Sequence, residues 1–265
     1  MKVHIITLKG LRDQNEDEHS VILNGDNKDC TMNSVNFFGV YDGHGGKQVS
    51  KFLANNLPYY FMKKKIKYPI SKTYVKKVYD HVQSLLRNKY KNFSYTTGST
   101  CLVVAHYKKN SQYYIDVMNT GDSRCVLCRD NIALPLTKDH KPIWPEEKRR
   151  IEQLGGKLYY DGDWRIKNLS VSKAFGDIEA APFVTHRPDI FHYKLDKSDK
   201  FLILACDGLW DVLDNNEAIN FVLENCYDEK FEKTNDKVNI AQKLAEHALR
   251  KGSMDNITVV VVFLK

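Results

Sequence analysis

The stretch VNFFGVYDGHGG, residues 35–46, is the most informative part of this 265-residue chain. Its first seven residues are mostly β-branched or aromatic, which predicts a strand over residues 35–41. Asp42-Gly43-His44-Gly45-Gly46 follows at once. A single Asp-Gly pair is typical of an ordinary turn. Here the pair follows a strongly apolar strand, and the same combination recurs elsewhere in the chain, which favours a functional role.

Acidic residues also lie at the ends of three further predicted strands. They are Glu16-Asp17, Asp207-Gly208 after FLILAC, and Asp255-Asn256 before ITVVVVFL. Carboxylates at strand ends are held rigidly and can converge. Several carboxylates cannot stay ionised side by side without a cation, because like charges raise each other's pKa. An all-oxygen ligand set points to Mg²⁺ or Mn²⁺.

Three other residues near these acids are candidates for the same site. Gly43 has no Cβ, so its carbonyl could approach a metal beside the Asp42 carboxylate. His44 is a candidate acid or base, with a metal ligand or a structural histidine as alternatives. Arg12 has a guanidinium suited to hold a phosphate, although alone it would be an ordinary surface arginine.

The predicted elements favour an α+β fold. Apolar residues at helical spacing predict helices between residues 46 and 63, over 75–86, and near 146–154, 216–224 and 238–250. Strands are predicted at residues 2–7, 19–23, 35–41, 100–107, 113–119, 124–129, 201–206 and 256–264. Because strands follow one another without a helix between every pair, we expect a central β-sandwich of two antiparallel sheets flanked by helices. No repeat or linker divides residues 1–265, which predicts a single domain.

Composition excludes several classes of protein. Hydrophobic residues make up 42% and charged residues 28% of the chain, which is typical of a globular protein rather than a disordered one. The longest apolar run, residues 257–264, is too short to span a bilayer, so no membrane association is expected. The N-terminus lacks a signal-peptide core, which predicts an intracellular protein, in the cytoplasm or the nucleus.

The six cysteines are expected to be reduced thiols packed in strands, with no disulfides. Cys125 and Cys128 have the spacing of a zinc or redox pair. No second Cys or His pair matches them, so packing is the favoured interpretation. Trp210 is also expected in the core.

The net charge is +7, and the excess is concentrated in one region. This region could attract an acidic partner, although a solvated face of two helices is the simpler interpretation. No nucleic-acid-binding signature accompanies it, so no nucleic-acid partner is expected. The cluster consists of Lys63, Lys64, Lys65, Lys67, Lys72, Lys76, Lys77, Lys89 and Lys91.

Taken together, the motifs of this chain resemble those of a known family, the metal-dependent protein serine/threonine phosphatases of the protein phosphatase 2C type. The resemblance spans residues 10–264 and rests on blocks that occur in the family's order. They are Arg12-Asp-Gln-Asn-Glu16-Asp17, Phe38-Gly-Val-Tyr-Asp42-Gly-His44-Gly-Gly46, Thr97-Gly-Ser-Thr100, Asn119-Thr-Gly-Asp122-Ser-Arg124, Asp139-His-Lys-Pro142, Val171-Ser-Lys-Ala-Phe-Gly-Asp177, Ala205-Cys-Asp207-Gly-Leu-Trp-Asp211 and Gly252-Ser-Met-Asp255-Asn256.

The resemblance implies a β-sandwich between helix pairs, with a two-metal site at one edge. In family terms Asp42 would bridge two Mg²⁺ or Mn²⁺ ions. The Gly43 carbonyl and Glu16 would bind one ion, and Asp207 and Asp255 would bind the other.

Further residues have implied supporting roles. Asp17 would hold a metal-bound water, and Asp122 with Asp207 resembles the site of a third, weaker ion. Thr100 and Asp211 would lie around the ligands.

The implied reaction is hydrolysis of phosphoserine and phosphothreonine in proteins by a water that two ions activate. Arg12 would bind the phosphate, and His44 would be the general acid for the leaving oxygen. We expect a monomer that acts on phosphorylated proteins.

Two departures from the family pattern concern substrate docking rather than the metal ligands. Arg165 is one residue closer to Leu169 than the family pattern has it, and a glycine between them is missing. Lys173 replaces a common arginine.

Other classes of protein fit less well. No cysteine has an arginine six residues later, which excludes a cysteine-nucleophile phosphatase. A haloacid-dehalogenase-like enzyme would need a second acid where Leu209 lies. A pseudophosphatase that keeps the fold to bind a partner is the remaining alternative, although the metal-binding acids are all present.

Overall fold

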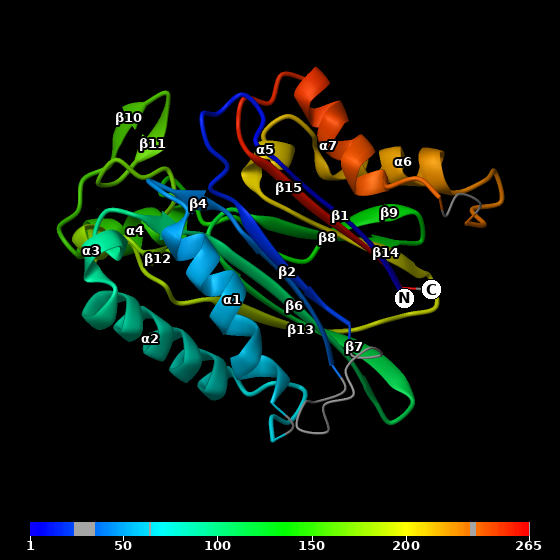
Figure 1. Ribbon diagram of the computed structural model, residues 1–265, viewed down its shortest axis with the longest axis horizontal. Helices are drawn as coiled ribbons and strands as arrows, with labels where there is room; N and C mark the ends of the chain where they lie inside the picture. Colours follow the sequence, from blue (N-terminus) through cyan, green and yellow to red (C-terminus); the bar gives the residue numbers. More distant parts are fainter. Residues whose placement is uncertain (24–34, 64, 234–236, 265) are drawn as a thin grey trace.

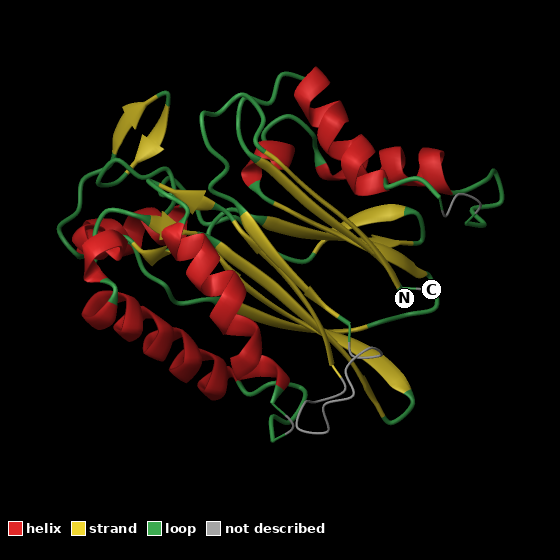
Figure 2. Cartoon of the chain, in the orientation of Figure 1, coloured by secondary structure: helices red, strands yellow, loops and turns green. Residues whose placement is uncertain are grey.

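Two antiparallel sheets of five strands each stack face to face in the computed structural model (Figure 1). Residues 1–23, 35–63, 65–233 and 237–264 are described. Helices cover the outer face of both sheets, as Figure 2 shows. The predicted α+β class with a central sandwich is confirmed.

The first sheet joins the two ends of the chain. Its strand order is β1-β15-β14-β8-β9, and Lys2 of the first strand lies opposite Phe263 of the last. The strands are β1 Lys2–Leu8, β15 Ile257–Phe263, β14 Asp199–Ala205, β8 Arg124–Arg129 and β9 Ile132–Pro135. This pairing brings the start and the end of the sequence to the same edge of the sandwich.

The second sheet has the order β13-β7-β6-β3-β2. Its strands are β13 Asp189–Lys194, β7 Gln112–Thr120, β6 Cys101–Lys109, β3 Val35–Tyr41 and β2 Glu18–Ile22. In β3, Phe37 and Tyr41 pack toward the helices, whereas Phe38 and Val40 pack between the two sheets. Because side chains alternate along a strand, both faces of β3 are buried, which explains its mostly apolar sequence.

Two helix layers complete the fold. The layer on the second sheet contains α1 Gln48–Met62, α2 Lys72–Lys89 and α3 Lys91–Ser94. The layer on the first sheet contains α5 Asp207–Trp210, α6 Asn215–Cys226 and α7 Ile240–Arg250. Leu53, Leu57 and Val82 of α1 and α2 are fully buried against the second sheet.

Smaller elements lie near one edge of the sandwich. They are α4 Pro145–Gln153, the hairpin β10 Tyr159–Asp161 and β11 Asp163–Arg165, and a small sheet of β12 Phe175–Gly176, β5 Gly98–Ser99 and β4 Gly43–His44.

The eight predicted strands and five predicted helices are all present, with ends shifted by a few residues. The predicted strand 256–264, for example, is β15 at Ile257–Phe263. Trp210 is 6% exposed in α5, so its predicted place in the core is confirmed.

The five cysteines among the described residues are buried and free. Cys101, Cys125 and Cys128 lie on strands as predicted, whereas Cys206 lies at the N-cap of α5 and Cys226 lies in α6. Cys30 and Lys64 lie outside the described residues. Within the described part of the chain, no helix combines the length and hydropathy needed to cross a bilayer.

Candidate functional site

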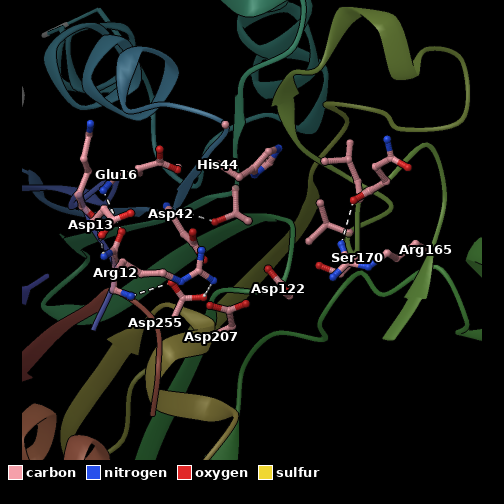
Figure 3. Close-up of a pocket in the computed structure, with 18 residues that line it drawn as sticks. Arg12, Asp13, Glu16, Asp42, His44, Asp122, Arg165, Ser170, Asp207 and Asp255 are labelled. Carbon is pink, nitrogen blue, oxygen red and sulfur yellow. Dashed lines mark hydrogen bonds and ion pairs between the residues drawn. The ribbon is translucent and has the colours of Figure 1, made fainter. Parts of the chain in front are cut away.

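A cavity of about 540 Å³ opens at the edge of the sandwich where several acidic residues meet (Figure 3). The directions of the strands explain why these acids lie close together. β3 and β7 both run antiparallel to β6, so Asp42 and Asp122 follow strand ends at the same edge. In the other sheet, Asp207 follows β14 and Asp255 precedes its antiparallel neighbour β15. Four acids far apart in the sequence therefore line one cavity.

Asp42, Asp122 and Asp207 form the centre of the acidic cluster. One carboxylate oxygen of each lies within 4.8 Å of the others. Burial raises the pKa of Asp42 well above its ordinary value, and repulsion from Asp207 and other carboxylates raises it further. The pKa of Asp207 is raised for the same two reasons, with Asp122 as its strongest repulsive neighbour. Without a counter-charge, the surroundings of Asp42 and Asp207 therefore disfavour the ionised carboxylates.

Asp17 lies beneath this cluster rather than in the cavity wall. It is 5% exposed, and its Oδ2 accepts a 2.7 Å hydrogen bond from the Thr258 hydroxyl. Its Oδ1 is buried and has no protein partner. Burial is the largest cause of the raised pKa of Asp17, which moves from 3.8 to about 7; hydrogen bonds from Thr258 and Cys206 oppose the shift, and the carboxylates of Asp255 and Glu16 add to it.

These residues fit a site for hard divalent cations. The donors around the centre are all oxygens, as Mg²⁺ and Mn²⁺ prefer. Besides Asp17, Asp122 also has a buried carboxylate oxygen, Oδ1, without a partner. A bound cation would satisfy such an oxygen and relieve the repulsion that raises the pKa values.

The backbone beside Asp42 is packed closely. A Cβ on Gly43 would lie 2.3 Å from the backbone oxygen of Glu16, so only glycine allows this approach. Thr100 donates its backbone N–H to the Asp42 carbonyl at 2.8 Å. The Thr100 hydroxyl is also within 2.8 Å of Ser123 Oγ. Thr100 thus supports the strand end that presents Asp42.

Arg12 lies at the rim of the cavity, and its Nη2 is 2.6 Å from Asp255 Oδ2. Its side chain is 59% exposed, so the guanidinium is accessible from solvent. Asn256 holds the loop that carries Arg12. Its amide nitrogen donates to the carbonyls of Lys9 and Gln14, and its Oδ1 accepts from the N–H of Glu16.

His44 is held by a buried carboxylate. Its Nε2 is 2.7 Å from Oδ2 of Asp177, which is 3% exposed. Burial lowers the pKa of His44, but the charge and hydrogen bond of Asp177 raise it, and the net pKa lies above the ordinary value.

The small sheet β4-β5-β12 creates this contact, because Gly98 pairs with both His44 and Gly176. A Cβ on Gly98 would lie 2.0 Å from Asp177 Oδ2 and 2.5 Å from His44 Nε2. The close approach of His44 to Asp177 therefore requires glycine at position 98.

Lys141 provides a positive charge inside the acidic cluster. Its ammonium contacts Asp122 Oδ2 directly. Burial lowers the pKa of Lys141, but the carboxylates of Asp122, Asp207 and Asp211 raise it above the ordinary value. Lys141 thus offsets part of the repulsion among the carboxylates.

The opposite wall of the cavity comes from the segment after β10. Figure 3 shows Arg165 and Ser170 across the cavity from the acids. Arg165 Nη1 donates to the carbonyl of Asn168 at 2.9 Å. Ile166 and Leu169 exchange backbone hydrogen bonds around Lys167 and Asn168, which have φ of 52° and 69°. Where the family pattern has a glycine, this chain forms a tight two-residue turn.

The sequence model described as Protein phosphatase 2C matches residues 1–257. The chain belongs to the protein phosphatase 2C family. Members of this family are metal-dependent protein serine/threonine phosphatases. The acidic cavity therefore lies in a phosphatase fold, and the resemblance noted from the motifs is confirmed.

Similar proteins come from distant organisms. The PP2C-like domain-containing protein R307 of Acanthamoeba polyphaga mimivirus is 48% identical over 56% of this chain and 93% of its own. Probable protein phosphatase 2C 59 of Oryza sativa subsp. japonica is 35% identical over 96% of this chain and 72% of its own. A solved serine-threonine phosphatase 2C from Toxoplasma gondii is 24% identical, with a TM-score of 0.81 over 99% of this chain and 94% of that one. At that identity the solved structure supports the fold alone.

Most of the predicted residues lie together at the site of this protein phosphatase 2C. The residues that line the cavity include Arg12, Glu16, Asp42, Gly43, His44, Asp122, Asp207 and Asp255. Asp17 lies below them. The structure brings Asp122 close to Asp42 and Asp207, whereas Asp255 contacts Arg12.

Three residues with clear contacts had no role in the sequence prediction. They are Asp177, Lys141 and Asn256, which all lie in the motifs quoted above. The sequence does not indicate their partners, because these lie far away along the chain. Asp177 contacts a histidine 133 positions away, and Asn256 accepts a hydrogen bond from a backbone N–H 240 positions away.

Proposed function

We propose that this protein hydrolyses phosphoserine and phosphothreonine in proteins at a site that holds two Mg²⁺ or Mn²⁺ ions. The convergence of Asp42, Asp122 and Asp207 in a cavity shared with Arg12 and His44 carries the proposal. Asp42, the Gly43 carbonyl, Glu16, Asp207 and Asp255 would hold the two ions. Asp122 would hold a third, weaker ion, and Asp17 would orient water. When bound, the ions would supply a water of lowered pKa for attack on phosphorus.

The chain's own residues would bind the phosphate and protonate the leaving group. Arg12 is exposed at the rim, and its planar guanidinium would pair with two phosphoryl oxygens. The carboxylate of Asp177 raises the pKa of His44 and so favours the protonated imidazole. Because Asp177 accepts from Nε2, the proton on Nδ1 is the one that His44 would give to the serine or threonine oxygen. An alkoxide is a poor leaving group and needs this proton.

The partner and location predictions remain part of the proposal. Family membership supports phosphorylated proteins as substrates. The single domain, the monomeric state, the intracellular location and the lack of nucleic-acid or membrane partners stay predictions.

The decisive experiment measures phosphate release from a phosphothreonine peptide with Mn²⁺, with Mg²⁺ and with EDTA. We expect turnover with either cation, no turnover in EDTA, and a loss of at least about 10³-fold in Asp207→Asn, because one central carboxylate is neutralised. Titration calorimetry with Mn²⁺ is the control for metal binding. Binding without turnover in the wild-type protein would contradict the proposal and favour a pseudophosphatase.

A further inference from the structure

The charge of this protein is distributed unevenly along the chain. Residues 43–115 contain fourteen lysines and arginines but a single acid, Asp80. The rest of the chain carries more acidic than basic residues. The basic segment includes α1 and α2, which lie side by side on the outer face of the second sheet (Figure 1). One side of the molecule is therefore strongly basic.

The cationic side chains of this layer are exposed to solvent. We call them the basic helix face. Its described members are Lys51, Lys63, Lys65, Lys67, Lys72, Lys76, Lys77, Arg87, Lys89 and Lys91. The one acid of the segment, Asp80, lies 2.8 Å from His186 Nε2 and so already has a partner. The positive potential of the face is thus nearly uncompensated within the segment.

Local helix energetics explain Arg87 and Lys89, which lie in the last turn of α2 where the helix dipole favours cations, but not the lysines near the helix starts. α1 and α2 have no acid in the first turn and no side-chain hydrogen bond at the N-cap. Lys72 lies in the first turn of α2, where the helix dipole disfavours a cation. Lys76 lies one turn further on, so the two like charges also repel.

Helices elsewhere in the molecule show the usual arrangement for a solvated face. α4 has Glu146 and Glu147 in its first turn, and Glu147 pairs with Arg150 within the helix. α6 has a complete capping box between Asp214 and Glu217. The first turns of α1 and α2 therefore lack the acids found in α4 and α6, and Lys72 weakens the start of α2.

The face begins next to the catalytic cavity. Gly45 lines the cavity, and α1 starts three residues later at Gln48. The 15 residues of α1 extend over ~22 Å at 1.5 Å per residue. An extended polypeptide covers that distance with about seven residues. A chain whose phosphorylated residue occupies the cavity could therefore reach Lys63, Lys65 and Lys72.

We propose that the basic helix face binds an acidic segment of the phosphoprotein substrate, about seven residues from the phosphorylated residue. This inference rests on the proposed phosphatase function. Complementary charge would supply most of the attraction and speed the encounter.

A protein segment fits this face better than a lipid bilayer. Among the described residues of α1 and α2, Leu53, Leu57 and Leu86 are buried in the core. The large side chain that α1 exposes is Tyr59, at 61%. A helix that inserts into a bilayer surface needs exposed Leu, Phe or Trp side chains.

The test uses two phosphothreonine peptides with Mn²⁺ as the cation. One is plain, and the other carries six glutamates after a Gly-Ser spacer of about eight residues. At low salt we expect the glutamates to lower KM by roughly fivefold without changing kcat, and high salt to remove the difference. The double variant Lys72→Glu with Lys77→Glu should lose most of the KM difference and hydrolyse the plain peptide normally. Its first substitution places an acid in the first turn of α2, so α2 should still form.

Lys194→Glu with Lys230→Glu is the matched control. Both lysines are exposed, lie outside the basic helix face and give the same change in net charge. This control should keep the full KM difference. An equal KM for both peptides in the wild type, or an equal loss in the control, would overturn the proposal.

A separate measurement distinguishes failure of the docking proposal from failure of the enzyme assignment. Fluorescence anisotropy of the glutamate peptide without phosphate reports binding even if the protein hydrolyses nothing. Binding to the wild type that Lys72→Glu with Lys77→Glu abolishes would support the docking surface on its own. Binding to phosphatidylserine vesicles without binding to the peptide would overturn it in favour of a lipid surface.

Discussion

Two regions of this molecule, the acidic cluster at the cavity and the basic helix face, each concentrate charge of one sign. They differ in how closely the charged groups lie and in how deeply they are buried. Carboxylate oxygens of Asp42, Asp122 and Asp207 lie within 4.8 Å of one another, and burial with mutual repulsion raises the pKa values of Asp42 and Asp207. The lysines of the basic helix face are spread over solvent-exposed helices, and their repulsion is screened. A buried cluster destabilises the fold until a counter-charge arrives, whereas an exposed one costs little. The first arrangement is suited to bind small cations tightly, and the second to attract a large partner weakly.

The largest effect on stability is expected from removing the counter-charge of the buried cluster. Lys141→Met should lower the free energy of unfolding of the metal-free protein by about 3–5 kcal/mol, because it leaves the buried Asp122 carboxylate unpaired. Divalent cations should bind more tightly to this variant than to the wild type, since no ammonium competes for Asp122. Urea unfolding in EDTA and titration calorimetry with Mn²⁺ measure the two quantities.

Lys138→Met is the control for this variant. Lys138 is exposed and pairs with Glu146, so its loss should change neither quantity. Unchanged stability in Lys141→Met would show that the ammonium does not compensate the cluster.

The next effect concerns the partner of His44. Asp177→Asn should lower kcat for a phosphothreonine peptide by roughly 10²-fold, because the imidazole is less often protonated and correctly held. Hydrolysis of p-nitrophenyl phosphate should change little, because its leaving group needs no proton. Asp80→Asn breaks another His–Asp pair at the surface and should leave both rates unchanged. Equal losses with both substrates would assign Asp177 a merely structural role.

A smaller effect is expected when pH changes the charge of the buried cluster. The pKa of Asp17 rises from 3.8 to about 7 on folding, and those of Asp42 and Asp207 also rise. The folded protein therefore keeps protons that the unfolded chain loses, so stability falls as pH rises from about 4 through 7. The raised pKa of His44 acts in the same direction, whereas the pKa values of His19, His106 and His186, which burial lowers, oppose the trend below about pH 6.5.

Thermal unfolding in EDTA checks this dependence. The metal-free protein should unfold at a lower temperature at pH 8 than at pH 5.5. Mn²⁺ should weaken or reverse the difference, because a cation stabilises the ionised carboxylates. A metal-free protein that becomes more stable over this range would contradict the assignment of raised pKa values.

The smallest effect tests the exposed cluster. Lys72→Glu should raise the free energy of unfolding by about 0.3–1 kcal/mol, because an acid then lies in the first turn of α2. Urea unfolding at low salt measures the gain, which high salt should reduce. Lys77→Glu changes the net charge equally but lies outside the first turn, so its gain should be smaller. A loss of stability in Lys72→Glu would mean that the lysine has a structural role.

The sequence predicted the long elements and the metal-binding acids, because both have local signals. β3 and β15 are mostly apolar runs, and Asp42 and Asp255 lie close to their ends. Short elements such as β4 and β12, each two residues long, carry no periodicity and exist only through pairing with β5.

The supporting contacts were not predictable for a related reason. Arg12 and Asp255 are 243 positions apart, and no local pattern indicates that they meet. In the sequence, the turn at Lys167 and Asn168 is indicated only by the missing glycine. Its backbone shows how two residues with positive φ replace it.

The pairing of β1 with β15 has a consequence for how the protein is made. Asn256 ties the loop that carries Glu16 to the start of the last strand, and Asp255 lies beside it. During synthesis on the ribosome, β1 cannot pair until β15, its partner in the sheet, has emerged. Such distant contacts form late and slow folding. A nascent chain therefore cannot bring Asp255 to Arg12 before β15 is made, and a product truncated before Asp255 would lack one acid of the cavity wall.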